Sequence, residues 1–285
     1  MRASGHASRP GTLSVVTAAG APPTLVLFPG DISTARDAML GSPDLAEWNA
    51  WSCEDLAELL SRRWPEYHAC VVHPPRSVDG FSCYDHWLTS LDATGDPVGG
   101  YDGSGSACAH LLTLLLAVPE LSASPLHLIA FSKGAVVLNQ IVAEMGGSSD
   151  SAQDLCDRVN SYVWLDPGLN REPGPILLGG QSDASLLHSA AQRMRKRKPS
   201  APRLSVALTP YQLQPRSWLR SWKLAWSWPP LRRESEAAAA QRNFAHLVRA
   251  EGLDVRCERY LTDRPASLDN HFGILDAFAA PWDAS

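Results

Sequence analysis

The segment Leu128-Ile-Ala-Phe-Ser-Lys-Gly-Ala-Val-Val-Leu-Asn-Gln140 decides the fold class of this 285-residue chain. Its first residues form an apolar run that predicts a buried strand ending at Ser132. An amphipathic helix is predicted to follow directly, with no residues left for a linker. Small residues, Ala130 and Gly134, stand two positions before and two positions after the serine. The segment therefore predicts a strand–serine–helix unit in which the helix and the strand cross closely.

The same alternation of apolar run, loop and helical stretch extends along the chain in both directions. The predicted core strands are 24–28, 69–72, 126–131, 161–165, 204–208 and 255–261. The predicted helices are 43–63, 106–116, 133–145, 184–198 and 233–251. Such alternation is typical of an α/β fold with a mostly parallel central sheet flanked by helices.

We expect one such domain over residues 24–285. Residues 1–23 are expected to be a flexible tail or a weak targeting segment that holds one short strand at 13–17. Residues 213–233 are expected to form a lid or cap.

Composition excludes several classes of protein. Hydrophobic residues make up 45% of the chain and charged residues 19%, which excludes global disorder. The net charge of −5 does not give the broad basic face of a nucleic-acid-binding protein. No apolar run reaches the ~20 residues that span a bilayer. Six dispersed cysteines lack zinc-ligand spacing, and the glycine-rich stretch 95–105 lacks a complete phosphate-binding motif, so we expect no metal and no cofactor.

Polar residues that follow the predicted strands form a candidate catalytic group, because ligands of such sheets bind beyond the carboxyl ends of the strands. The segment Ala130-Phe-Ser-Lys-Gly134 resembles the G-x-S-x-G nucleophile turn of α/β-hydrolases, with alanine in place of the first glycine. Asp166 ends the next strand, and His271 follows the last one. Ser132, Asp166 and His271 therefore stand in the chain order of that fold's catalytic triad.

The remaining parts of the predicted site are backbone groups. The N–H groups of Lys133 and of Gly30–Asp31 are the candidate oxyanion donors. Other interpretations stay open: Ser132 could cap the following helix, and Asp263 or Asp269 could be the acid. Many members of the fold place the acid after the following strand, which here ends in Thr209-Pro-Tyr-Gln212 without a carboxylate.

Six blocks of the sequence resemble, in order, the chromosome 2 open reading frame 69 family, a eukaryotic group with an α/β-hydrolase-like core. The blocks are Leu27–Asp31, Phe81–Asp85, Phe131–Gln140, Trp164–Asp166, Thr209–Gln212 and Ser267–Phe272. The chain departs from the family at Ala130 and at Pro167-Gly-Leu169, where the family tends to have Gly-Gly-His. The resemblance implies a serine-hydrolase-like site and a mitochondrial setting, and it places Phe81 and Tyr84 near the mouth of the site.

Aromatic residues elsewhere are candidates for substrate contact. Tyr211 and Trp218 are further candidates for the mouth. The segment 218–228 carries four tryptophans among basic residues, which favours a lid or a peripheral membrane contact, with a packed cap as the alternative.

We therefore expect a serine hydrolase that cleaves an ester, thioester or amide bond in a small-molecule or acyl substrate. The alternative is a catalytically silent hydrolase-fold scaffold that binds a partner protein. No nucleic-acid partner is expected. The location is expected to be intracellular, either mitochondrial or cytoplasmic.

Overall fold

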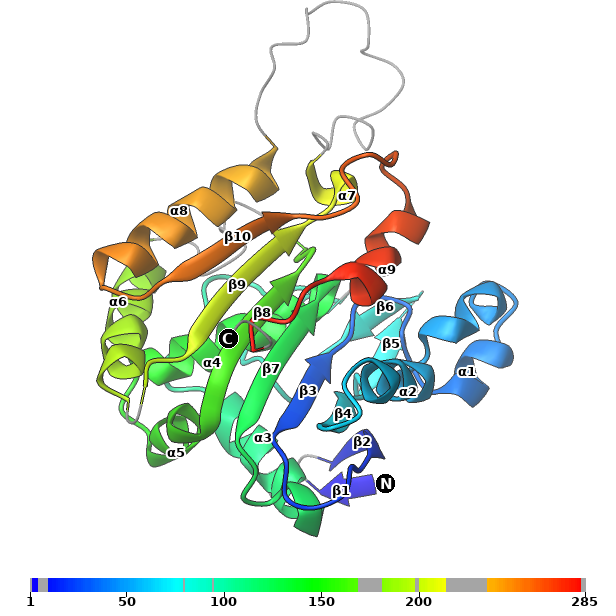
Figure 1. Cartoon of the computed structure of the whole chain (residues 1–285), viewed down its shortest axis with the longest axis horizontal. Helices are drawn as coiled ribbons and strands as arrows, with labels where there is room; N and C mark the ends of the chain where they lie inside the picture. Colours follow the sequence, from blue (N-terminus) through cyan, green and yellow to red (C-terminus); the bar gives the residue numbers. More distant parts are fainter. Residues whose placement is uncertain are drawn as a thin grey trace, which may run out of the picture.

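The fold is built on an eight-stranded sheet (Figure 1). The structure is a computed structural model that describes residues 2–4, 10–78, 80–93, 95–168, 181–197, 200–213 and 235–282. The strand order is β1-β2-β4-β3-β7-β8-β9-β10. The strands are β1 (Arg2–Ser4), β2 (Pro10–Val16), β3 (Thr24–Phe28), β4 (His68–Val72), β7 (Leu126–Phe131), β8 (Val159–Leu165), β9 (Arg203–Leu208) and β10 (Val255–Arg259). The six strands from β4 to β10 run parallel, whereas β2 pairs with β4 antiparallel.

The predicted fold class is confirmed, and the predicted core strands are found at their expected places. The predicted ranges of β3 and β7 agree with the structure at both ends. Every residue of these two strands is buried, as expected for strands covered on both faces.

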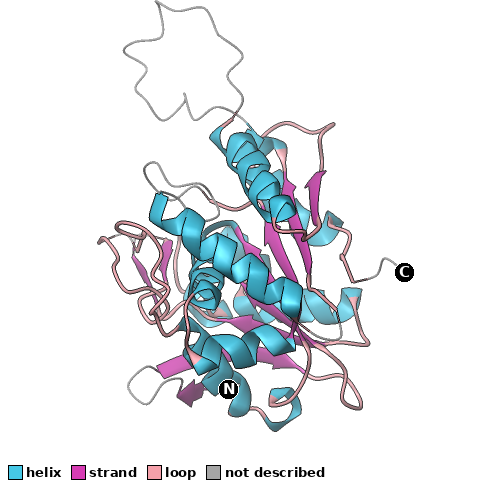
Figure 2. Cartoon of the chain, turned by 90° about the vertical axis from the view of Figure 1, so that its left-hand side faces the viewer, coloured by secondary structure: helices cyan, strands magenta, loops and turns pink. Residues whose placement is uncertain are grey.

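Helices cover both faces of the sheet. The longer helices are α2 (Cys53–Arg63), α3 (Ala107–Leu116), α4 (Ala135–Gly146), α5 (Asp150–Arg158), α6 (Gln181–Lys196), α8 (Glu236–Ala250) and α9 (Leu268–Ala277). One core cluster joins alternate strand residues such as Val26 and Leu128 to α3, α4, α5, α6 and α8. The other joins the intervening residues, such as Leu27 and Ile129, to α2 and α9. Figures 1 and 2 show the sheet held between these two helical layers.

Shorter elements connect the layers. They are α1 (Arg36–Leu40), η1 (Ala46–Trp51), η2 (Pro119–Leu121), η3 (Ser132–Gly134), α7 (Pro210–Leu213) and the hairpin β5 (Arg76–Val78)–β6 (Phe81–Cys83). The predicted helix 43–63 divides at Ser52, whose side chain accepts the Asp55 N–H and caps α2.

The sheet extends into residues 1–23, where the sequence analysis expected a tail with one short strand at 13–17 and the structure has β2. β2 forms a ladder with β4 from Leu13↔Val72 to Val16↔Ala69. Leu13 is 1% exposed, so this strand contributes to the core. The predicted start of the domain at residue 24 therefore lies inside the domain, because β2 already belongs to its sheet.

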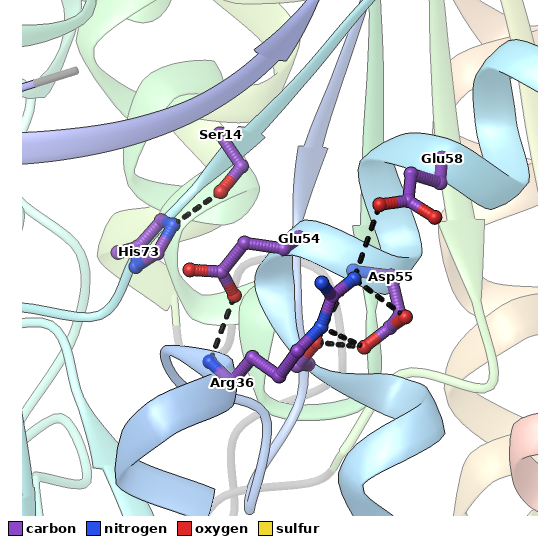
Figure 3. A network of polar contacts seen from close by, with 7 residues as sticks. Ser14, Arg36, Glu54, Asp55, Glu58 and His73 are labelled. Atoms are coloured by element: carbon purple, nitrogen blue, oxygen red, sulfur yellow. Dashed lines mark hydrogen bonds and ion pairs between the residues drawn. The ribbon is translucent and has the colours of Figure 1, made fainter.

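Two sets of polar contacts lie near this edge of the sheet, one between β2 and the end of β4 and one between α1 and α2 (Figure 3). Ser14 Oγ and His73 Nε2 lie 2.7 Å apart and share a hydrogen bond. The Arg36 guanidinium donates to Asp55 and Glu58, and the Arg36 N–H donates to Glu54 Oε2 at 2.8 Å. These bonds tie the first turn of α1 to the exposed side of α2.

Candidate active site

Ser132 lies in a sharp turn between β7 and the η3–α4 helical segment. Its φ angle is 51°, a left-handed conformation that is uncommon for a residue with a side chain. Gly134 permits the close crossing, because a Cβ there would lie 2.0 Å from the Phe28 carbonyl oxygen. Gly30, after β3, approaches from the other side, and a Cβ there would lie 2.7 Å from Ser132 Cβ. The two glycines allow the ends of β3 and β7 to meet around the serine.

Asp166 and His271 form a buried hydrogen-bonded pair. His271 Nδ1 donates to Asp166 Oδ2 at 2.6 Å, and the two residues are 3% and 0% exposed. Asp166 follows β8 and has a φ angle of 44°. His271 lies in the first turns of α9, whose N-cap Ser267 accepts the Asn270 N–H. The structure thus brings the predicted base to the predicted acid across 105 residues of sequence.

The imidazole is held between two aromatic rings. The centroids of Phe131 and Tyr211 lie 4.6 and 4.5 Å from that of His271. Phe131 is the last residue of β7 and directly precedes Ser132, so its contact places the imidazole near the serine turn. Packing on two sides restricts the orientation of the imidazole.

The end of β9 fixes the carboxylate of Asp166. The Thr209 N–H donates to Oδ1 at 2.7 Å, and Thr209 Oγ1 donates to Oδ2 at 2.5 Å. Gln212 Nε2 donates to the Asp166 carbonyl at 3.3 Å. Thr209 follows β9, where many members of the fold have the acid and this chain has no carboxylate. Its two hydrogen bonds instead fix the carboxylate of Asp166, which follows the neighbouring strand β8.

Ser132 and Asp166 are neighbours at the carboxyl edge of the sheet. β7 and β8 pair up to Phe131↔Leu165, and each candidate is the next residue of its strand. The Gly168 N–H donates to the Ser132 carbonyl at 3.0 Å, which joins the two turns. Within the described residues, the Ser132 hydroxyl and His271 share no hydrogen bond, and in ligand-free enzymes this contact often tightens only with substrate.

The rival acids lie elsewhere. Asp263 and Asp269 are both exposed, Asp263 in the loop between β10 and α9 and Asp269 in the first turn of α9. The His271 ring instead makes its hydrogen bond with Asp166.

The loop after β3 is braced by the segment 81–85. Tyr84 Oη donates to the Pro29 carbonyl at 2.5 Å, and Ser82 Oγ donates to the Gly30 carbonyl at 3.0 Å. The Ser82 N–H donates to Asp31 Oδ1 at 3.0 Å. The next residue, Ile32, has a φ angle of 63°, and its N–H donates to the Gly80 carbonyl. These contacts set the course of the backbone that carries two of the candidate oxyanion donors.

A buried lysine and two carboxylates lie beside the turn that carries Ser132. Lys133 is 2% exposed, and its Nζ lies 2.9 Å from Asp96 and 3.9 Å from Asp31. Burial raises the pKa of Asp31 to about 6, against the lowering effects of Lys133 and of the Ser82 hydrogen bond. His271 also lowers the pKa of Asp31 by Coulomb attraction, which places this carboxylate within electrostatic reach of the imidazole.

The candidates for the mouth of the site have different environments. Phe81 is 46% exposed, and its ring lies 5.7 Å from Lys133 Nζ. The Tyr211 ring packs against the His271 ring at a tilt of 31°. Tyr84 is fully buried, so its placement at the mouth is wrong, and its hydroxyl donates to the Pro29 carbonyl in the loop after β3. Trp218, with the segment 214–233, lies outside the described residues.

Sequence reasoning missed two residues of the site, Ser82 and Asp96, and it noted that Thr209 follows a predicted strand but gave it no role. Only their contacts reveal what these three residues do. In the described part of the chain, no three His, Cys, Asp or Glu side chains are grouped to hold a metal ion. The described helices include none that is long and apolar enough to cross a membrane.

Comparison with known proteins places the chain in a family. The C2orf69 family model matches residues 13–124 and 117–221. The chain belongs to the C2orf69 family. The mitochondrial protein C2orf69 homolog of Danio rerio is 30% identical over 277 residues, covering 89% of this chain and 72% of that protein. The Homo sapiens mitochondrial protein C2orf69 is 23% identical over 314 residues, covering 89% of this chain and 74% of its own length.

Solved structures show the same fold. The siderophore hydrolase EstB from Aspergillus nidulans has a TM-score of 0.51 at 15% identity, covering 98% of this chain and 91% of its own. The acylaminoacyl peptidase of Pyrococcus horikoshii has a TM-score of 0.51 at 12% identity, covering 97% of this chain and 38% of its own. The C2orf69 chain described here therefore has a hydrolase-like α/β fold.

Proposed function

We propose that this C2orf69-family chain is a serine hydrolase that cleaves an ester, thioester or amide bond. The observation that carries the proposal is the buried 2.6 Å hydrogen bond between His271 and Asp166, next to a serine held in a strained turn. A serine hydroxyl is a weak nucleophile at neutral pH unless a base takes its proton. An imidazole oriented by a carboxylate is the group that commonly does so.

In the proposed reaction, Ser132 Oγ attacks the carbonyl carbon while its proton passes to His271 Nε2. Asp166 holds the ring through Nδ1 and stabilises the imidazolium that forms. The carbonyl electron pair moves to the oxygen, and the N–H groups of Lys133 and of Gly30–Asp31 would donate to that oxyanion. Collapse of the intermediate breaks the bond to the leaving group, which takes the proton from His271.

The second half of the reaction repeats these steps with water. His271 takes a proton from the water, which attacks the acyl-Ser132 ester. Collapse of the second intermediate releases the carboxylic acid, and the proton returns to Ser132 Oγ.

Covalent labelling with a neutral alkyl fluorophosphonate tests the proposal. We expect the wild-type chain to be labelled, Ser132→Ala to show no labelling and His271→Ala to label at least 100-fold more slowly. Ser122→Ala and His246→Ala change a half-buried serine and an exposed histidine, and both variants should label like the wild type. Circular dichroism must show that all variants are folded. A folded wild-type chain that reacts with none of several probe sizes would favour the scaffold alternative.

The names of the relatives support a mitochondrial location, which we propose for this chain as well. Expression of the full chain with a C-terminal tag, followed by fractionation, tests this. Recovery only in the cytosolic fraction would contradict it.

A further inference from the structure

The carboxylate of Asp31 lies 3.9 Å from the ammonium of Lys133, the residue after the proposed nucleophile, and has no part in the proposed triad. Asp31 follows Gly30, whose Cα lies close enough that an added Cβ would meet Ser132 Cβ at 2.7 Å. One of its oxygens is fixed by the Ser82 N–H, and its side chain is 35% exposed. A fixed, partly exposed carboxylate at this place can meet a substrate that reaches Ser132.

The charges around Asp31 do not cancel. Lys133 Nζ faces two carboxylates, Asp96 at 2.9 Å and Asp31 at 3.9 Å. Asp96 is closer to the ammonium and less exposed, with a 19% exposed side chain. The uncompensated negative charge therefore rests mainly on Asp31, at the more exposed position.

We infer that Asp31 selects substrates by charge, so that the site takes acyl substrates or leaving groups that carry a cationic amine, guanidinium or quaternary ammonium group and disfavours those that carry a carboxylate. The inference rests on the proposed function. Its physical reason is that a cation near Ser132 is attracted by Asp31, whereas an anion is repelled. A substrate cation also offsets the repulsion between Asp31 and the oxyanion that forms during attack, and this gain exists mainly in the transition state.

Three fluorophosphonates of matched size test the inference. One carries a neutral group, one a trimethylammonium group and one a carboxylate, and the second-order labelling rate of the wild-type chain is measured with each. We expect the cationic probe to react about tenfold faster than the anionic one, a modest factor because Asp31 is partly screened by water.

In Asp31→Asn this rate ratio should fall close to one. Asparagine can still accept the Ser82 N–H, so the loop keeps its brace. The control is Asp37→Asn, which removes an exposed carboxylate from α1 and should leave the ratio unchanged.

The pH dependence of the ratio gives a second readout. Because the pKa of Asp31 is raised to about 6, the preference should be present above this pH and be lost as pH falls below it. The titratable groups that interact with Asp31 are Lys133, Asp96, His271, Cys83 and Tyr84. The ratio compares probes at the same pH, so a pH effect that is common to all three probes cancels.

The outcomes separate the inference from the proposed function. Labelling by the neutral probe without a charge preference, or with a preference that persists in Asp31→Asn, overturns the inference and leaves the proposed function standing. A preference for the anionic probe also overturns it, because Lys133 would then dominate. If no probe reacts with the folded wild-type chain, both fail.

Discussion

Three residues around the proposed active site have side chains and yet adopt left-handed backbone conformations. Ser132, Asp166 and Ile32 have φ angles of 51°, 44° and 63°. Such conformations cost about 1–3 kcal/mol each and persist where surrounding contacts fix them. Hydrogen bonds from Gly168 to Ser132 and from Asp166 to Ala207 supply such contacts here. The chain therefore gives up stability at the residues that shape the site.

Asp31 should lower the stability of the fold at neutral pH. Its pKa rises from the ordinary value of 3.8 for an aspartate side chain to about 6 in the folded chain, mainly because the carboxyl is buried. The folded state thus holds this proton more tightly than the unfolded state, and the free energy of unfolding decreases as pH rises from about 4 to about 6. Above that range the cost is fully present. Asp31→Asn should therefore raise the free energy of unfolding at pH 7.5 by about 1–2 kcal/mol, a value reduced for its partial exposure.

Urea unfolding of Asp31→Asn and the wild type at pH 7.5 and pH 4 measures this effect. The stability difference should be largest at pH 7.5 and should shrink at pH 4. A variant that is less stable than the wild type at pH 7.5 would contradict the prediction.

At the scale of elements, the ends of β8 and β9 act together to orient His271. β8 supplies Asp166, and β9 supplies the two Thr209 donors that hold its carboxylate. The strands pair in parallel up to Leu165↔Ala207, and Asp166 and Thr209 follow one and two residues later at the same carboxyl edge. The orientation of the acid thus depends on the pairing of two strands, and α9 adds the imidazole.

Thr209→Val should weaken the reaction without removing a reacting group. Valine keeps the shape and the backbone N–H but loses the hydroxyl that donates to Asp166 Oδ2 at 2.5 Å. We expect fluorophosphonate labelling to slow by about tenfold, the value of roughly one lost hydrogen bond to a charged group. Thr209→Ser restores the hydroxyl and should recover most of the rate. Equal rates in the valine and serine variants would show that the hydroxyl does not orient the acid.

The sequence predicted the core elements well because their signals are local. β3 and β7 are continuous apolar runs, and Ser132 is followed at once by the expected helical segment. Helix α5 was missed although Ser149 caps it, because its buried residues are only three: Ala152, Leu155 and Cys156. These residues stand at positions i, i+3 and i+4, which is the helical spacing from which the helix could have been predicted.

The parts of the site that sequence reasoning missed depend on contacts between distant segments. The Ser82 N–H donates to Asp31 across 51 residues, and Lys133 pairs with Asp96, from which α3 and β7 separate it in the sequence. The local motif gave Lys133 a backbone role only, whereas the structure also buries its ammonium between two carboxylates. No periodic pattern in the sequence encodes such pairs.

For the whole molecule, the sheet order explains how residues far apart in the chain meet. β3, β7, β8 and β9 are consecutive neighbours, and their carboxyl ends supply Gly30, Ser132, Asp166 and Thr209. The opposite edge of the sheet has a different role. There the C-terminal Trp282 packs on His127 of β7, with ring centroids 4.6 Å apart, and Tyr67 contacts both rings. This aromatic cluster ties the end of the described chain to the amino ends of the central strands.

His127 should make the whole fold sensitive to acid. Burial, with a smaller contribution from Arg203, lowers its pKa from 6.5 to about 4, so the folded state keeps the imidazole neutral. The His127 imidazole becomes protonated below about pH 6.5 in the unfolded chain but only below about pH 4 in the folded chain. Proton uptake by His127 in the unfolded chain should therefore lower the free energy of unfolding by about 3 kcal/mol as pH drops through this range, partly offset by the about 1–2 kcal/mol from Asp31, and this loss should level off below the range.

Urea unfolding between pH 7.5 and pH 4 tests this with His127→Gln. Glutamine cannot take up the proton, so the variant should lose less stability across the range than the wild type, even if it is less stable at pH 7.5. His246→Gln removes an exposed histidine on α8 and should keep the steep wild-type dependence. If His127→Gln follows the same pH dependence as the wild type, another buried group sets the acid sensitivity. His68 and His73, whose pKa values burial also lowers, would then be the next residues to change.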